Sequence, residues 1–329
     1  MLGYRKTFQN LTNKIRFTII HYCLLLSSSA VIAYGYFRGV DQPNLAVRLQ
    51  LHNQILGAAA PSPYRYRILV PFTCEFIKDV LSFFSFDIGK AFLFAYALYD
   101  FFSIFFLLVS LFVWLRIWFS SDQALIGSLF TASVIPIALR DHVFQPWSLL
   151  EVVFLQAAFI CIFKRSYFLL AFIIILASLN RETALFIPLA YLLTNFQDKK
   201  SDRLKLILNF GAYFILWFAV FFGLRLLLGN APHVETIEAL MRRNTTTHNL
   251  LLALIHWSLF LGVFWILAIL GFQYAPSFIK RLAGIIPLYL LVVLLWGVWY
   301  EVRLLMPMYS IFIPLGLSYV FRKSIRNST

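Results

Sequence analysis

Residues 167–196 read YFLLAFIIILASLNRETALFIPLAYLLTNF, two apolar runs separated by Asn180, Arg181 and Glu182. Together the runs are long enough to enter a lipid bilayer, whose hydrocarbon core of about 30 Å needs roughly 20 apolar residues per helix. A charged side chain in lipid costs about 3 kcal/mol on insertion scales, so it normally faces a protein interior or a water-filled cavity. The stretch therefore predicts membrane-inserted helices whose charged residues have a role in function.

The whole chain has the same character. Of its 329 residues, 61% are hydrophobic and only 13% are charged, and the mean hydropathy is +0.81. Blocks such as residues 101–114 are continuously apolar, unlike the short alternating strands of an outer-membrane barrel. We therefore predict an all-α fold, a polytopic transmembrane helical bundle in which residues 1–329 form a single integral-membrane domain.

The apolar blocks divide the chain into about ten expected crossings. These lie near residues 17–37, 89–115, 122–139, 145–163, 166–180, 183–197, 205–228, 249–272, 282–299 and 303–321. Residues 68–86 differ, because Glu75, Lys78 and Asp79 recur at helical spacing opposite an apolar stripe. Such a pattern is typical of a helix lying in the membrane interface, here within a first outer loop over residues 38–88.

Lysine positions support this topology, because cytoplasmic loops carry an excess of positive residues. If residues 68–86 do not cross, one side of the membrane receives Lys6, Lys14, Lys164, Lys199, Lys200, Lys205, Lys280 and Lys323. Both termini are then predicted to be cytoplasmic. The net charge of +14 is scattered between spans, which favours membrane lipid headgroups over nucleic acid as the partner.

The polar residues that remain between spans collect on the outer side and are mainly arginines, whose planar guanidinium groups suit phosphate. Residues 64–67 read YRYR after two prolines. They offer two guanidinium groups and two aromatic rings to a sugar phosphate, or else only anchor the chain at the membrane surface. Several arginines at one depth predict an anionic ligand at the outer leaflet.

Other candidates have simpler alternatives. Asp41 follows the first span and could accept a proton from a hydroxyl, or could cap the next helix. His52 is either a ligand contact or an ordinary polar residue of the interface, and residues 140–142, with Asp141 and His142, are either ligand contacts or a helix end with a local ion pair. Arg181 and Glu182 could form a purely structural pair. His, Asp and Glu do not recur at a metal-ligand spacing, so no cofactor is predicted, although metal dependence stays open.

This layout resembles the GT-C class of integral-membrane glycosyltransferases, which take sugars from polyprenyl-phosphate carriers. The resemblance covers nearly the whole chain: an amino-terminal span, a first outer loop with an acidic residue and interfacial helices, and then further spans with polar outer turns. In a bacterial subset of the class, short segments look like residues 64–71 (YRYRILVP), 180–183 (NRET) and 301–303 (EVR), in this order. The resemblance implies a GT-C-like bundle in a bacterial inner membrane, with its active face outside.

The resemblance also implies residue roles. Asp41 matches the acidic position proposed as the general base, but Gln42 follows it where many members have a second acid, so Asp141 or Glu182 could substitute. The implied ligands of the donor phosphate are Arg65, Arg67, Arg181 and Arg303. The further expected substrate contacts are His52, Tyr64, Tyr66, His142 and Glu301.

The expected activity is inverting transfer of a sugar, from a polyprenyl-phosphate-linked donor to a glycan, lipid or protein acceptor at the outer face. A non-enzymatic carrier or flippase for a lipid-linked or anionic substrate is the first alternative, and it predicts an equivalent site at the inner face. A glycan polymerase is the second, although such proteins usually have a larger outer loop than residues 38–67 or 229–248.

Overall fold

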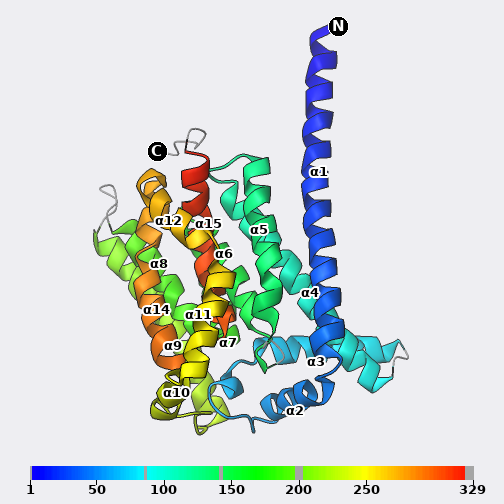
Figure 1. The fold of residues 1–329 in the computed structure, drawn as a ribbon, viewed down its shortest axis with the longest axis vertical. Helices are drawn as coiled ribbons and strands as arrows, with labels where there is room; N and C mark the ends of the chain where they lie inside the picture. The colour runs from blue at the N-terminus through cyan, green and yellow to red at the C-terminus, as the bar shows by residue number, and fades with distance from the viewer. Residues whose placement is uncertain (1, 85–86, 141–143, 197–202, 323–329) are drawn as a thin grey trace.

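The structure, a computed structural model, describes residues 2–84, 87–140, 144–196 and 203–322. It is all-α, as predicted, and its helices pack side by side in a bundle (Figure 1). The amino-terminal part comprises α1 (Leu2–Tyr36), η1 (Phe37–Asp41), α2 (Leu45–Leu56), η2 (Tyr64–Tyr66), α3 (Leu69–Phe83), α4 (Ile88–Leu115) and α5 (Ser121–Leu139). The middle comprises α6 (Ser148–Phe163), α7 (Tyr167–Asn180), η4 (Glu182–Leu185), α8 (Phe186–Asn195) and α9 (Arg203–Leu228). The last part comprises α10 (Ile237–Asn244), α11 (Thr247–Leu261), α12 (Phe264–Gly271), η5 (Phe272–Tyr274), α13 (Ser277–Leu282), α14 (Ile285–Trp296), η6 (Val302–Leu305) and α15 (Met306–Val320).

The number of membrane spans is lower than the ten expected. Six helical segments of the described chain are long and apolar enough to cross, and α11 with α12, bent by 63°, would make a seventh. The difference lies mainly in α6, α7 and α8, which have 16, 14 and 10 residues. At about 1.5 Å per residue the longest of the three reaches only about 24 Å, less than the hydrocarbon core. An integral-membrane protein with six or seven candidate spans is therefore what length and composition support.

The helices α2 and α3 lie across one end of the bundle, together with α10, at the bottom of Figure 1. The candidate spans include neither α2 nor α3. On α3, Val70 and Cys74 are fully buried, whereas Phe76 and Phe83 are 69% and 85% exposed. An apolar exposed face on a helix across the bundle end is the arrangement expected of an interfacial helix. The first residues of α1 and the end of α15 lie at the opposite end of the bundle.

The last helix, α15, lies at the centre of the bundle. Together with η6 it forms the candidate span Val302–Val320, and 89% of the apolar part of this span is buried. It packs most closely on α12, where a Cβ added to Gly271 would lie 1.9 Å from the Leu315 carbonyl oxygen. The Trp114 indole of α4 donates a hydrogen bond to the Ser310 carbonyl oxygen at 2.8 Å. This core fixes η6 and the turn before it at the end of the bundle where α2, α3 and α10 lie.

Candidate functional site

Two loops are joined at that end of the bundle. The Ser62 N–H donates to the Pro232 carbonyl oxygen at 2.9 Å, and the Val234 N–H donates to the Ser62 carbonyl oxygen at 2.8 Å. Arg65 donates to the backbone oxygens of Ala60, Leu228 and Asn230, and the Tyr66 hydroxyl donates to that of Gly229. Arg65 and Tyr66 therefore hold the two loops together, and neither side chain lines the cavity beneath them.

A cavity of about 440 Å³ lies under these loops. Its walls come from segments far apart in the sequence: the loop before α3, the α7–η4 junction, the ends of α9 and α14, the loop before α10, α10 itself, and η6. The lining residues are Ser62, Pro63, Tyr64, Arg67, Gln145, Arg181, Glu182, Thr183, Phe221, Arg225, His233, Val234, Glu235, Leu240, Arg243, Tyr289, Val292, Val293, Trp296, Gly297, Val298, Glu301, Arg303 and Leu304.

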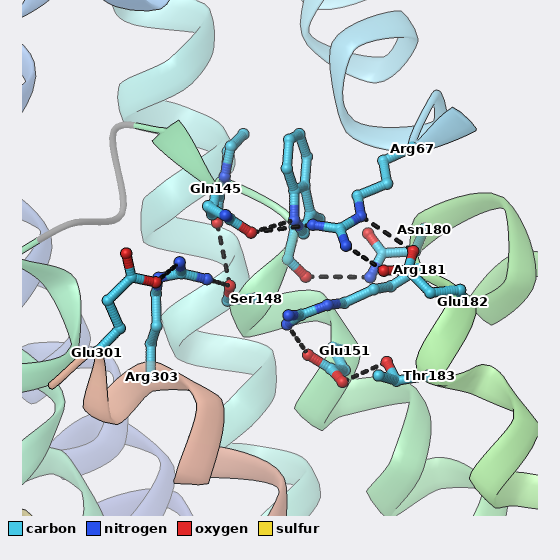
Figure 2. Close-up of polar contacts among 12 residues, drawn as sticks. Arg67, Gln145, Ser148, Glu151, Asn180, Arg181, Glu182, Thr183, Glu301 and Arg303 are labelled. Carbon is cyan, nitrogen blue, oxygen red and sulfur yellow. Dashed lines mark hydrogen bonds and ion pairs between the residues drawn. The ribbon is translucent and has the colours of Figure 1, made fainter. Parts of the chain in front are cut away.

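Three of the arginines predicted from the sequence meet at this cavity, although they come from three different segments (Figure 2). Arg67, Arg181 and Arg303 are 4%, 7% and 2% exposed. Each is paired with a carboxylate: Arg67 with Glu182, Arg303 with Glu301, and Arg181 with Glu151 at 2.5 Å. The carboxylate partner fixes the orientation of each buried guanidinium group.

A polar framework positions these arginines. The Arg67 Nη1 donates to Gln145 Oε1 at 2.9 Å, and the Gln145 amide donates to the Tyr64 hydroxyl at 3.0 Å. The Arg67 guanidinium also lies over the Trp147 ring, 5.0 Å from its centroid. These contacts connect the loop before α3 to the amino-terminal end of α6. Tyr64 thus lines the cavity, and its hydroxyl accepts a hydrogen bond from Gln145.

The loop before α6 also holds the α7–η4 junction and η6 in place. The Asn180 side-chain amide donates to the Trp147 carbonyl oxygen at 3.0 Å, and Arg303 Nη1 donates to the Ser148 hydroxyl at 3.4 Å (Figure 2). The Thr183 hydroxyl donates to the second oxygen of Glu151. The network leaves the Nε–H donors of Arg181, Arg243 and Arg303 without a partner among the described residues.

Two further arginines of the cavity, Arg225 and Arg243, were not among the residues predicted to form the site. Arg243 of α10 pairs with Glu235 at 2.9 Å. Arg225 lies in the last turn of α9, with its guanidinium 4.3 Å from the Tyr66 ring centroid and 3.4 Å from that of Phe221. Within the described parts of the chain it forms no ion pair. An arginine near the end of a long apolar helix was the sequence signal for Arg225, but such residues often extend to lipid headgroups instead.

One wall of the cavity is apolar. Phe221 of α9 and Val292, Val293 and Trp296 of α14 supply it, with Leu304 of η6. On α14, Leu291 and Trp296 are both 53% exposed at the outside of the bundle. The cavity therefore combines a cluster of guanidinium groups with an apolar surface that continues to the lipid-facing side of α14.

The arrangement suits an anion. Five arginines line the cavity and three glutamates offset part of their charge, while Glu151 lies behind Arg181 outside the lining. The excess of positive charge in a partly desolvated space attracts a phosphate or carboxylate group. Arg225 has no carboxylate partner in the described chain, so an anion can bind it without breaking an ion pair.

Glu182 is held as an anion by its partners. Burial would raise the pKa of this carboxyl, but the Arg67 charge and hydrogen bonds, assisted by Arg181, lower it from 4.5 to about 2. Its side chain is 33% exposed, so solvent screens part of the attraction. A carboxylate so stabilised is a counter-ion for Arg67 and a weak proton acceptor.

This pKa predicts a pH dependence of stability. A pKa lowered by folding means that Glu182 contributes its full stabilisation above about pH 4.5 and loses it as the pH falls towards 2. We expect the thermal unfolding temperature of the detergent-purified protein to fall more steeply below pH 4.5 in the wild type than in Glu182→Gln. Parallel curves for the two proteins would contradict the assignment.

Asp41 and His52 lie outside the cavity. Asp41 is 1% exposed, and its Oδ1 lies 2.8 Å from Arg48 Nη2 in an ion pair. Arg48 also contacts Asp100 at 3.4 Å and donates to the Tyr36 hydroxyl at 2.6 Å. The segment between α1 and α3 thus buries its acidic residue against α4, because Arg48 on α2 provides a cation there. Asp41 is therefore a buried counter-ion of Arg48 and does not line the cavity.

His52 belongs to the same buried region between α2, α3 and α4. Its ring nitrogens contact the Tyr96 hydroxyl at 3.0 Å and Glu75 at 2.9 Å. Burial lowers the pKa of His52, against the opposing effect of Glu75. His52 therefore connects α2 to α3 and α4. Asp141 and His142 lie outside the described residues.

Neither a family model nor a curated protein nor a solved structure was found to match this chain. Among the described residues, no group of three or more His, Cys, Asp or Glu side chains is arranged to hold a metal ion.

Proposed function

We propose that this protein is a membrane glycosyltransferase that moves a sugar from a polyprenyl-phosphate donor to an acceptor at the outer face of the membrane. One observation carries the proposal: a single cavity joins five arginines to an apolar wall at the end of the bundle where α2, α3 and α10 lie. A lipid-linked phosphate has the same two parts, an anionic group and a hydrocarbon chain.

The arginines divide into two kinds. Arg225 lacks a carboxylate partner within the described chain and is stacked on Tyr66 and Phe221, so it is ready to receive the donor phosphate. Arg181 and Arg303 are more deeply buried, and each retains an unused Nε donor beside its ion pair. They would add positive potential as the phosphate gains charge.

The apolar wall supports a lipid carrier over a free sugar phosphate. Val292 and Trp296 belong to the cavity, whereas Leu288, Leu291 and Leu295 of the same helix are exposed at the lipid-facing side of α14. A polyprenyl chain that leaves the cavity beside α14 would replace lipid on this surface. Its apolar area would then be buried at little cost.

The proposed reaction uses these parts directly. The acceptor hydroxyl oxygen attacks the anomeric carbon, the bond from that carbon to the phosphate oxygen breaks, and the electron pair stays on the phosphate. The leaving group changes from a phosphodiester to a phosphomonoester and gains negative charge. Fixed guanidinium groups stabilise that charge without reorganising, and the loss of one such donor typically costs about 100- to 1,000-fold in kcat.

The test is donor consumption by purified protein in nanodiscs, with a panel of polyprenyl-phosphate sugars and a membrane extract as acceptor source. Arg225→Met keeps an unbranched side chain on Tyr66 and Phe221 but removes the charge. We expect roughly 10- to 100-fold weaker donor binding, as for loss of a charge-assisted hydrogen bond worth about 1.5–3 kcal/mol.

The matched control is Arg242→Met, because Arg242 lies one residue from Arg243 on α10, is exposed, and pairs with Glu238 on the same helix. It should bind and consume donor as the wild type does. Binding of donor without any consumption by the wild type would favour the carrier alternative. Equal donor affinity for Arg225→Met and the wild type would contradict the proposed phosphate site.

A further inference from the structure

The proposed transfer needs a proton acceptor for the acceptor hydroxyl, and the cavity carboxylates are already engaged. Glu182 pairs with Arg67, Glu235 with Arg243, and Glu301 with Arg303. Each of these carboxylates therefore already has a guanidinium partner inside the cavity. His233 lines the same cavity, and it forms no ion pair within the described chain.

The hydrogen bonding of His233 determines which of its nitrogens is available. Nδ1 lies 2.7 Å from the Glu235 carbonyl oxygen, which can only accept a hydrogen bond. Nδ1 therefore carries the proton and donates. The longer 3.4 Å contact from the Glu235 N–H to the same nitrogen is the weaker one and does not change this assignment. In the neutral ring Nε2 then holds the lone pair.

The backbone holds this histidine in position. Ser62 and His233 form a β-bridge, in which the residues on either side of His233 exchange hydrogen bonds with Ser62. The Ser62 segment is in turn held by the contacts of Arg65 and Tyr66 with residues 228–230. The imidazole is exposed at the rim of the cavity, where an acceptor would arrive from the aqueous side.

We infer that His233 is the general base of the proposed transfer, which makes this inference dependent on the function proposed above. Nε2 takes the proton from the acceptor hydroxyl as its oxygen bonds to the anomeric carbon. The carbon–oxygen bond to the donor phosphate breaks and its electrons remain on the phosphate. The proton then leaves the imidazolium for water or for the released polyprenyl phosphate, which restores neutral His233.

The test compares His233→Ala with the wild type in the donor-consumption assay, with added imidazole as a small-molecule substitute. The bridge to Ser62 uses backbone atoms alone, so the variant should keep the wild-type unfolding temperature. We expect kcat to fall about 100- to 10,000-fold, the usual range for loss of a general base, with the donor KM changed less than about threefold. Imidazole should restore part of the lost kcat.

His248→Ala is the control, because His248 is an exposed histidine at the start of α11 that does not line the cavity. It should keep the wild-type kcat and show no response to imidazole. For His233→Ala, an unchanged kcat, or a loss that imidazole does not relieve, would overturn the inference. A wild type that consumes no donor would instead remove the proposed function itself, so the two failures are distinguishable.

Discussion

Arg181→Ala is expected to lower the free energy of unfolding by roughly 3–5 kcal/mol, the usual cost of removing one partner from a buried ion pair. Arg181 and Glu151 are 7% and 4% exposed in their side chains and lie 2.5 Å apart. Without the guanidinium, Glu151 keeps one hydrogen bond from Thr183 but loses its counter-ion inside the bundle. Thermal or denaturant unfolding of the detergent-purified variant measures this loss.

The double variant Arg181→Met with Glu151→Gln separates stability from function. It removes both charges, so most of the lost stability should return. Donor binding should not return, because Arg181 lines the cavity while Glu151 lies behind it. If the double variant recovers both properties, Arg181 is a structural residue only and has no role in binding the donor.

Arg48→Met is expected to destabilise the protein by a similar amount, roughly 3–5 kcal/mol, because one cation serves two buried carboxylates. Asp41 and Asp100 each have side chains that are 1% exposed, and both contact Arg48. Replacing Arg48, Asp41 and Asp100 together by Met, Asn and Asn removes all three charges. We expect this triple variant to regain much of the unfolding temperature.

Asp41→Asn alone distinguishes the buried cluster from the base role that the family resemblance implies. Since Asp41 lies outside the cavity, the variant should lose some stability but keep the wild-type kcat for donor consumption. A folded Asp41→Asn protein with wild-type unfolding temperature and no turnover would return the role of general base to Asp41.

The sequence predicted an all-α membrane protein for a physical reason. Apolar runs and a bilayer together determine that the chain must be helical, and the ends of spans on one side must lie near the same depth. Depth placed Arg65, Arg67, Arg181 and Arg303 at one level, and the last three line the cavity whereas Arg65 does not. It was not enough to count the spans, because α6, α7 and α8 are apolar but short.

Side-chain direction could not be predicted from depth. Arg225 and Asp41 both lie near the end of a span, yet one lines the cavity and the other is buried against α4. The difference depends on which residues lie beside each side chain. Arg225 lies against the Tyr66 ring, and Asp41 pairs with Arg48. The position of His233 could not be predicted for the same reason, since it depends on a β-bridge to Ser62. Such pairings arise only when the bundle is assembled.

The central claim is that the cavity recognises the phosphate of a lipid carrier. Equilibrium binding of a polyprenyl monophosphate and of the matching polyprenol, measured on the same nanodisc preparation of wild-type protein, tests it most directly. We predict at least about tenfold tighter binding of the phosphate, since charge-assisted hydrogen bonds contribute about 1.5–3 kcal/mol each. Arg225→Met should remove most of this preference. Equal affinity of the wild type for the phosphate and the alcohol would contradict the claim.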